Sequence, residues 1–483
     1  MEGSKKPRRA TRPWITLRND AAAVAIDAAG GSIASFVLGD GVNPLSWDSA
    51  VHDQQDVEKT APRPLGHFLC LDRWGPPSVA EEAQGMPYHG EASSRHWHVV
   101  ELDSPVVRLE AQLPMAGLAV ERRLELVKCQ AARRAVDAPQ GGAAVTMTQV
   151  KNINQLGRIF NMVQHPSIAA PFLSAETRVD CNGKRGFTQG PRGCAEVLWH
   201  APREFPAAVT ARDGVRDAHG MTGGADDVFS YEVDPKETYG WVTWQGGWSK
   251  CTSGYVWPRA EYPWVSLWCS SEVDGDQRPR ARGLEFGTTG LHQPFPILTK
   301  HPRIFDLPTF EHLDAAPSST RKSFCSFLLS IPSHFRGVQR VELVAAAAAA
   351  PARKLRIWEK DTGSSVEIAA ETERWLDAVA KAVKEGWDGL QIQQAVADVV
   401  AEDPVGCARF METTHRPTQA VHYHDKMIQG AFSAMWSTYP RIPQEDPWAD
   451  NVPKVDCEVV CPGQGVVMTS SGLALRGEPV EGL

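Results

Sequence analysis

The chain has 483 residues, a length that favours two domains, and its 42% hydrophobic and 22% charged residues are usual for a protein with a sizeable core. The net charge of −8 argues against a nucleic-acid-binding protein. No segment approaches the roughly 20 apolar residues of a membrane-spanning helix. We therefore expect neither a nucleic-acid partner nor a membrane partner.

The N-terminal 13 residues carry five lysines and arginines, and no apolar run follows that would make a secretory signal. We predict a disordered basic tail over residues 1–13, with contact to an anionic surface as the alternative. The ten cysteines are scattered, and several lie in apolar strand-like runs where a thiol behaves as a small hydrophobic group. This pattern predicts reduced thiols and a cytoplasmic location. Only Cys457 and Cys461 stand close together, which leaves a metal or redox pair open.

From Trp14 onward, short segments rich in β-branched and aromatic residues alternate with Asp, Gly, Asn and Pro, as in strands separated by turns. The predicted strands are "WITLRND" (14–20), "AAVAID" (22–27), "GSIASFVLG" (31–39), "HWHVVELD" (96–103), "VVRLEAQL" (106–113), "LAVERRLELVK" (118–128), "AAVTMTQVKNIN" (143–154), "YGWVTWQGG" (239–247), "PWVSLWCS" (263–270), "GLEFGTTG" (283–290) and "SFCSFLLSIPSHF" (323–335). Helical periodicity is almost absent here. The pattern predicts a mainly β fold, a large antiparallel β-sandwich or barrel rather than a βαβ sheet.

The sequence changes character near residue 344. The alanine-rich run 345–350 predicts a linker or a short helix that ends at the following proline. "KLRIWEK" (354–360) and "SSVEIAA" (364–370) predict two more strands, which we expect to return to the sandwich. We therefore assign residues 14–368 to the β-sandwich.

Helical spacing appears only after this point. Apolar residues between Trp375 and Val383 share one helical face, Gly386 follows as a C-terminal cap, and a second apolar pattern stops at Pro404. We predict a C-terminal helical extension and an irregular tail over residues 369–483. In that tail, "HYHDK" is most simply a set of surface or hydrogen-bonded histidines. Coordination of a metal by His422, His424 and Asp425 is the alternative.

Three segments of the β-rich part carry polar groups that contrast with their surroundings. His89 lies in the loop "GMPYHGEASSRHW", His165 stands between apolar runs in "RIFNMVQHPSIAAPF", and Glu285 interrupts an apolar strand in "RGLEFGTTGLHQPF". Each alone has an ordinary structural explanation, as a turn histidine, a core histidine or an edge-strand glutamate. Two imidazoles and one carboxylate that met in space would form an acid–base site.

The order of these segments resembles the galactose mutarotase-like (aldose 1-epimerase) superfamily. The resemblance rests on "GGSIASFVLGDGVNPLSW" (30–47), "YHGEASSRHW" (88–97), "NMVQHPSIAAPF" (161–172), "YPWVSLW" (262–268) and "RGLEFGTTG" (282–290), and it extends over residues 14–345. It implies a large antiparallel β-sandwich with a sugar cleft on one concave face. It also implies a sugar or oligosaccharide as partner and chemistry that uses no cofactor.

The resemblance further implies roles for single residues. His165 matches the general acid of the family, Glu285 its general base, and His89 a histidine that binds or polarises the sugar. Arg73 lies where the family often has a substrate-binding arginine, although the residues around it do not match the usual pattern.

Tryptophan offers an apolar surface to the C–H face of a sugar. Among the tryptophans near these motifs we select Trp74 and Trp248 as substrate-binding residues. Gln245 joins them because it lies beside two glycines that permit a close approach.

The residue types suit the opening of a sugar ring. One group removes the proton of the anomeric hydroxyl while the other protonates the ring oxygen, and closure on the other face gives the second anomer. Ser167 and Ile168 follow the His-Pro pair where the family commonly has an aromatic residue. Because of this difference and the long C-terminal region, two alternatives remain. One is a non-catalytic carbohydrate-binding or sensing protein, and the other is a polysaccharide lyase or glycoside hydrolase that uses the same cleft.

Overall fold

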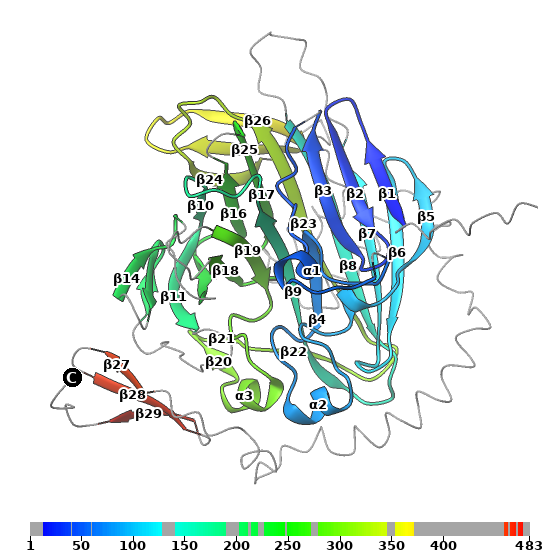
Figure 1. Ribbon diagram of the computed structural model, residues 1–483, viewed down its shortest axis with the longest axis vertical. Coiled ribbons are helices and arrows are strands. Elements are labelled where there is room, and N and C mark those ends of the chain that lie inside the picture. The colour runs from blue at the N-terminus through cyan, green and yellow to red at the C-terminus, as the bar shows by residue number, and fades with distance from the viewer. Residues whose placement is uncertain are drawn as a thin grey trace, which may run out of the picture.

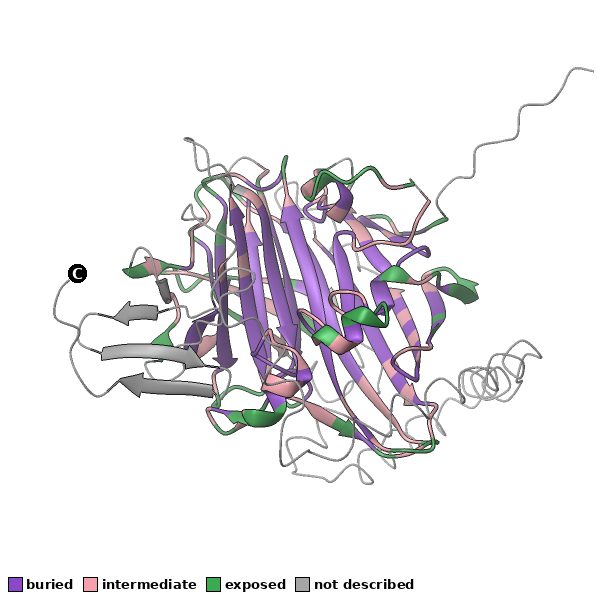
Figure 2. Ribbon diagram, turned by 60° about the horizontal axis from the view of Figure 1, so that its bottom comes forward, coloured by how far each residue is buried: buried purple, intermediate pink, exposed green. Residues whose placement is uncertain are grey.

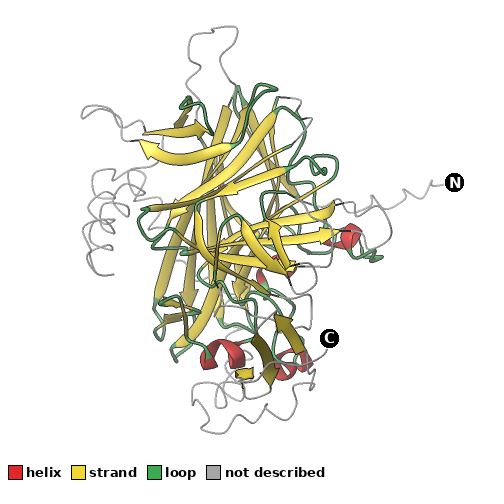
Figure 3. Cartoon of the chain, turned by 90° about the vertical axis from the view of Figure 1, so that its left-hand side faces the viewer, coloured by secondary structure: helices red, strands yellow, loops and turns green. Residues whose placement is uncertain are grey.

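A computed structural model describes residues 13–39, 41–58, 60–127, 141–189, 202–210, 214–220, 227–246, 249–271, 279–344 and 353–370, and the strands between residues 458 and 476. Two large antiparallel sheets dominate these residues, and Figure 3 shows that strands make up the body of the molecule. The predicted mainly β, antiparallel sandwich is therefore confirmed. No helix among the described residues is long and apolar enough to cross a membrane.

The larger sheet has eleven strands and carries the site described below. Their spatial order is β1 (Trp14–Arg18), β2 (Ala22–Asp27), β3 (Ser32–Leu38), β4 (His67–Asp72), β9 (Arg158–Ala169), β19 (Pro279–Gly287), β18 (Trp264–Ser271), β15 (Asp227–Val233), β11 (Gly183–Gln189) and β12 (Arg203–Glu204), with β22 (Glu311–Leu313) paired to β9. Strands β4, β9, β19 and β18 therefore lie at its centre, although they are far apart in the sequence (Figure 1).

The smaller sheet has eight strands and packs against the larger one. Their order is β10 (Arg178–Cys181), β16 (Tyr239–Gln245), β17 (Cys251–Pro258), β23 (Ser319–Ser330), β8 (Gly141–Asn152), β7 (Leu118–Leu126), β6 (Val106–Leu113) and β5 (His98–Asp103). Strand β7 alternates buried and half-buried residues along its whole length, as expected for a strand with one face in the core. Figure 2 shows that the long central strands are mostly buried.

Short elements complete the description. They are the helices α1 (Ser49–His52), α2 (Val79–Ala83) and α3 (Phe295–Lys300), the 3₁₀ turn η1 (Ala92–Ser94), and the strand groups β13 (Ala207–Thr210) with β14 (Gly214–Asp217), β20 (Arg303–Ile304) with β21 (Leu307–Pro308), β24 (Val338–Val344) with β25 (Arg353–Glu359) and β26 (Ser365–Ala370), and β27 (Glu458–Cys461) with β28 (Gln464–Thr469) and β29 (Gly472–Arg476). Except for β27–β29, the described residues end at Ala370. The helices predicted after that point, the residues Cys457, His422, His424 and Asp425, and the basic tail before Pro13 all lie outside the described residues.

The sheet β24–β25–β26 forms a third layer on the outer face of the smaller sheet. Val341, Leu355 and Ile368 from this sheet share one buried apolar cluster with Trp241 and Phe327 of the smaller sheet. The two strands predicted after the alanine-rich run are β25 and β26, and they do pack against the sandwich.

Close packing brings together two of the segments on which the sequence resemblance rests, the one that contains Gly31 and the one that ends at Trp97. Gly31 has φ +64°, and a Cβ there would lie 2.3 Å from the ring of Trp97. The Trp97 indole donates a hydrogen bond of 2.8 Å to the carbonyl of Ala92. The glycine pair before β3 and Trp97, at the end of the loop that contains His89, therefore fix this loop against the larger sheet.

Candidate functional site

The pairing of four central strands brings distant residues to one face of the larger sheet. His165 on β9 stands opposite Phe68 on β4, and Glu285 on β19 stands opposite Ser266 on β18. Strand β19 pairs with β9 through Gly283 and Ser167, which places Glu285 beside His165. Alternate side chains of a strand point to opposite faces, and Met162 on β9 and Leu284 on β19 belong to the main apolar core, so the dyad lies on the face turned away from that core.

His165 and Glu285 form a close pair, called the dyad below. The His165 Nε2 atom lies 3.2 Å from the Oε2 atom of Glu285, and the two residues are only 4% and 1% exposed. The Trp74 indole donates a hydrogen bond of 2.5 Å to the same oxygen of Glu285. Phe68 stacks on the His165 ring, with the ring centres 4.3 Å apart. The dyad thus lies in an aromatic environment, with both nitrogens of His165 and the Oε2 atom of Glu285 close to polar partners.

Burial shifts the pKa values of the two members of the dyad in opposite directions, because it disfavours the charged form of each. It raises the pKa of the Glu285 carboxyl well above its ordinary range, and the hydrogen bond from Trp74 reduces this rise. Burial, together with the neighbouring His292, lowers the pKa of His165 to about 3. Over a wide pH range the dyad therefore holds one titratable proton, and its neutral form is a protonated Glu285 beside an uncharged His165.

Half-buried rings surround the dyad on the solvent side. His89 has φ 66°, a conformation that is uncommon for a residue other than glycine, and its ring centre lies 5.2 Å from that of His165. The Nδ1 atom of His89 accepts a hydrogen bond of 3.1 Å from the backbone N–H of Gly75. Neutral His89 therefore carries its proton on Nε2. On another side of the dyad, Trp268 is half-buried, with its ring centre 6.1 Å from that of His165.

A glycine leaves the space that the dyad occupies. A Cβ on Gly283 would lie 3.0 Å from the Oε1 atom of Glu285 and 3.1 Å from the Cε1 atom of His165. It would also lie 3.1 Å from the Cβ of Trp268. A side chain at this position would displace at least one of the three, so the geometry of the site depends on this glycine.

Arg73 has partners other than the dyad. Its guanidinium is paired with Asp72 and lies 2.5 Å from a carboxylate oxygen of Glu81 on α2. Asp72 is also paired with Arg158, and all four residues are buried. Arg73 additionally lies over the ring of Phe295, 5.2 Å from its centre. Its role in substrate binding remains a prediction, whereas its place in a buried ion-pair network is observed.

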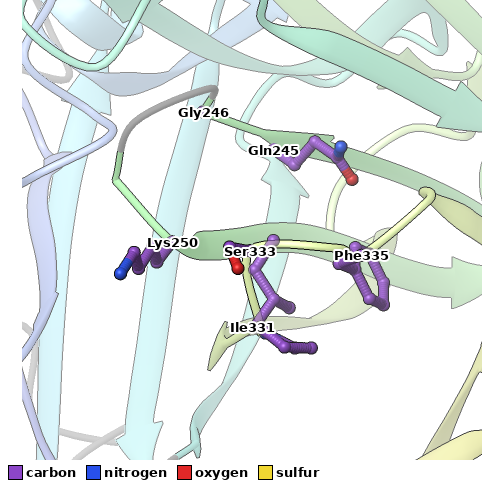
Figure 4. Close-up of a pocket in the computed structure, with 7 residues that line it drawn as sticks. Gln245, Gly246, Lys250, Ile331, Ser333 and Phe335 are labelled. Carbon is purple, nitrogen blue, oxygen red and sulfur yellow. The ribbon is translucent and has the colours of Figure 1, made fainter.

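The structure separates Gln245 from the dyad. Gln245 ends β16 in the smaller sheet and lines a small pocket of about 160 Å³ with Lys250, Ser333, Phe335 and their neighbours. Figure 4 shows that the Gln245 amide and the Lys250 side chain point in different directions, so they do not converge on one ligand. The predicted grouping of Gln245 with His165 and Glu285 is not seen here, because β16 belongs to the other layer of the sandwich.

The other two predicted substrate-binding residues are tryptophans. Trp74 is 1% exposed and donates to Glu285, so it holds the carboxyl group rather than offering a ring face to solvent. Trp248 lies outside the described residues.

Among the residues of the site that were not selected from the sequence are His292 and Ser167. His292 lies in the loop after β19, and its Nε2 atom is 3.2 Å from the Tyr88 hydroxyl. Its ring packs edge-on against Trp74, with the centres 4.8 Å apart. Ser167 places its Oγ 2.9 Å from the Nδ1 atom of His165. The signal for His292 was its position seven residues after Glu285, and the signal for Ser167 was the i, i+2 spacing that puts it on the same strand face as His165.

The donor set at this site suits acid–base chemistry. It combines one carboxyl group, three imidazoles and two hydroxyls with aromatic walls. Among the described residues, no group of three or more His, Cys, Asp or Glu side chains has an arrangement that could hold a metal ion.

Comparisons with known proteins give structural similarities only. No protein-family model matches the chain, and no curated protein matches it. The chain is similar to the galactose mutarotase-related enzyme of Lactobacillus acidophilus, with 13% identity over 65% of this chain and 96% of that chain and a TM-score of 0.45. It is also similar to a galactose mutarotase-like protein of Lactobacillus casei, with 12% identity over 65% of this chain and 100% of that chain and a TM-score of 0.43. It is similar as well to a candidate aldose 1-epimerase of Escherichia coli, with 14% identity over 66% of this chain and 99% of that chain and a TM-score of 0.42. These names belong to the superfamily that the sequence motifs resemble.

Proposed function

We propose that this chain is a cofactor-free sugar epimerase that interconverts anomers by acid–base opening of the ring. The observation that carries the proposal is the 3.2 Å separation between His165 Nε2 and Glu285 Oε2. The two oxygens that must exchange protons in this reaction, the ring oxygen and the anomeric hydroxyl, are bonded to the same carbon. An acid and a base that stand side by side can therefore reach both oxygens at once.

The proton shared by the dyad supports the two roles. In the ion-pair form, His165 protonates the ring oxygen and Glu285 removes the proton of the anomeric hydroxyl. In the neutral form, Glu285 is the acid and His165 the base. The two forms differ by the transfer of one proton within the dyad, and ring closure runs the same steps in reverse. Either form therefore serves a reaction that must proceed in both directions.

The half-buried rings around the dyad support a sugar as the substrate. The Nε2–H group of neutral His89 is a hydrogen-bond donor, as binding or polarising a sugar oxygen requires. Trp268 is aromatic and half-buried beside the dyad, so its ring can pack against the C–H face of a sugar.

The test uses a panel of freshly dissolved single anomers of neutral, acidic and phosphorylated sugars, followed by polarimetry and by exchange NMR. We expect the full-length protein to accelerate equilibration of at least one of them and Glu285→Gln to abolish the acceleration. The matched control is Glu367→Gln on the exposed face of β26, which should retain the full rate. Equal rates for buffer, wild type and Glu285→Gln on every sugar would refute the proposal.

The same panel separates the alternatives. A sugar that binds in calorimetry without faster equilibration would indicate a binding or sensing protein. Shortened or unsaturated oligosaccharide products in mass spectrometry would indicate a hydrolase or a lyase.

A further inference from the structure

Ser167 is fully buried directly beside the catalytic imidazole. It lies two residues after His165 on β9 and shares the same face of the sheet. Its backbone N–H donates a hydrogen bond of 2.9 Å to the carbonyl of Gly66, and it faces Gly283 across the pairing of β9 with β19. Both contacts fix the backbone of Ser167, so its Oγ is held 2.9 Å from the Nδ1 atom of His165.

The two nitrogens of His165 therefore have different partners. Nε2 faces the carboxyl oxygen of Glu285, and Nδ1 faces the Ser167 hydroxyl. A neutral imidazole carries one proton, so one nitrogen donates and the other accepts. The partner of one nitrogen decides which nitrogen holds the proton.

The environment of the dyad favours one of the two tautomers. Phe68 and the Trp74 indole enclose the dyad, and separated charges are disfavoured in such surroundings. A neutral dyad places the titratable proton on Glu285, whose O–H group then donates to Nε2 of His165. The proton of the imidazole is left on Nδ1, where the Ser167 hydroxyl accepts it.

We propose that Ser167 is a positioning residue that accepts the Nδ1–H of His165 and so makes Nε2 the only nitrogen that exchanges protons with the substrate. This role rests on the proposed epimerase function. In ring opening, the Nε2 proton of the cationic His165 passes to the ring oxygen, and the bond from that oxygen to the anomeric carbon breaks. The proton of the anomeric hydroxyl passes to Glu285, and a carbonyl group forms. His165 remains protonated at Nδ1 throughout, so neither a ring flip nor a change of tautomer is needed between opening and closing.

The first test reads the tautomer without any turnover. The full-length protein is labelled with ¹⁵N in histidine, and the His165 signals are identified by their loss in His165→Gln. We expect a protonated-type shift for Nδ1 and an unprotonated-type shift for Nε2 near neutral pH. In Ser167→Ala we expect both shifts to move toward the other tautomer. A wild-type His165 protonated at Nε2, or shifts unchanged in Ser167→Ala, would overturn the proposal.

The second test uses the anomer that wild type equilibrates fastest. We expect Ser167→Ala to lower kcat by roughly 10- to 100-fold, the range typical when the partner that orients a functional histidine is lost, with KM nearly unchanged. Ser167→Thr keeps the hydroxyl and should restore most of the rate. The matched control is Ser326→Ala, another buried serine, whose hydroxyl bonds to the Ala144 carbonyl of the smaller sheet.

The outcomes of the two tests are distinct. A kcat for Ser167→Ala equal to that of wild type, measured on folded protein, would overturn the positioning role. If wild type equilibrates no sugar, the proposed epimerase function fails, and the nitrogen shifts alone then decide whether Ser167 accepts the Nδ1 proton.

Discussion

Replacing Glu285 with glutamine should stabilise the protein at neutral pH while abolishing the proposed epimerase activity. The folded protein holds Glu285 protonated above pH 4.5, whereas the unfolded chain releases that proton near its ordinary pKa. Folding therefore takes up a proton, and the free energy of unfolding falls as the pH rises above 4.5. Glutamine has the shape of the protonated acid, its carbonyl in the place of Oε2 can accept from Trp74, and it has no proton to release.

The size of the effect follows from the linkage relation. One proton of difference changes the free energy of unfolding by about 1.4 kcal/mol per pH unit. His165 works in the opposite direction, because its pKa is lowered to about 3 in the folded protein against an ordinary value of 6.5, so its contribution rises with pH up to 6.5. In wild type the two contributions cancel between pH 4.5 and 6.5, and above pH 6.5 stability declines. Glu285→Gln keeps only the His165 contribution. Between pH 4.5 and 6.5 its free energy of unfolding should therefore rise by roughly 3 kcal/mol relative to that of wild type.

The assay is urea unfolding followed by tryptophan fluorescence at half-unit steps from pH 4 to 8. The difference between Glu285→Gln and wild type should be near zero at pH 4 and should grow steadily above pH 4.5. Other titrating groups contribute equally to both proteins and cancel in the difference. Glu367→Gln, at an exposed ion pair with Lys354 and Arg356, should give no such rise. Parallel curves for wild type and Glu285→Gln would show that the folded protein ionises Glu285 at an ordinary pKa.

Three further variants test the surroundings of the dyad and the third layer. Gly283→Ala should stop the equilibration of anomers and lower the free energy of unfolding by about 1–3 kcal/mol through overpacking, and full activity would contradict the tight geometry. Arg73→Met removes the guanidinium that pairs with buried Glu81 and one of the two that pair with buried Asp72, so it should lower the free energy of unfolding by about 3–5 kcal/mol in urea, whereas a stable variant with only a raised KM would show that Arg73 contacts substrate. Burial alone would raise the pKa of Asp180, but hydrogen bonds from His219 and Lys360 bring it below its ordinary value of 3.8. Asp180→Asn should therefore lower the free energy of unfolding by about 3 kcal/mol at pH 7, with the difference from wild type shrinking as the pH falls below 3.8, and a difference independent of pH would contradict this.

The sequence carried most of the information on the strands. A short apolar segment between turn residues located β2 (Ala22–Asp27), and the alternation of apolar and polar residues located β6 (Val106–Leu113), both with the bounds that the structure has. Such patterns are local, and one buried face is enough to produce them. The short helices were missed because each has four to six residues, which is too few for helical periodicity to appear. Helix α2 is set mainly by its capping box, in which Ser78 and Glu81 bond to each other's backbone N–H groups.

The chemistry of the site was only partly readable in the sequence. His89, His165 and Glu285 were selected as polar residues in apolar settings, and the structure does bring them together. Which other residues lie beside these three depends on strand pairing, and no local pattern of the sequence records that pairing. Trp74 donates to Glu285 because the turn after β4 ends beside β19, and Gln245 is remote because β16 pairs into the other sheet.

The number of carboxyl groups near the dyad bears on which carbohydrate reaction fits the site. Glycoside hydrolysis usually needs two carboxyl groups, about 5 Å apart for retention of configuration and about 6.5–9.5 Å apart for inversion. The described side chains placed around the dyad are aromatic, imidazole and hydroxyl groups, and Glu285 supplies the carboxyl group. Asp72 and Glu81 are engaged with Arg73 and Arg158 in the buried ion-pair network. Epimerisation needs one acid and one base that exchange roles on two oxygens of the same carbon. A dyad with a single shared proton meets that requirement.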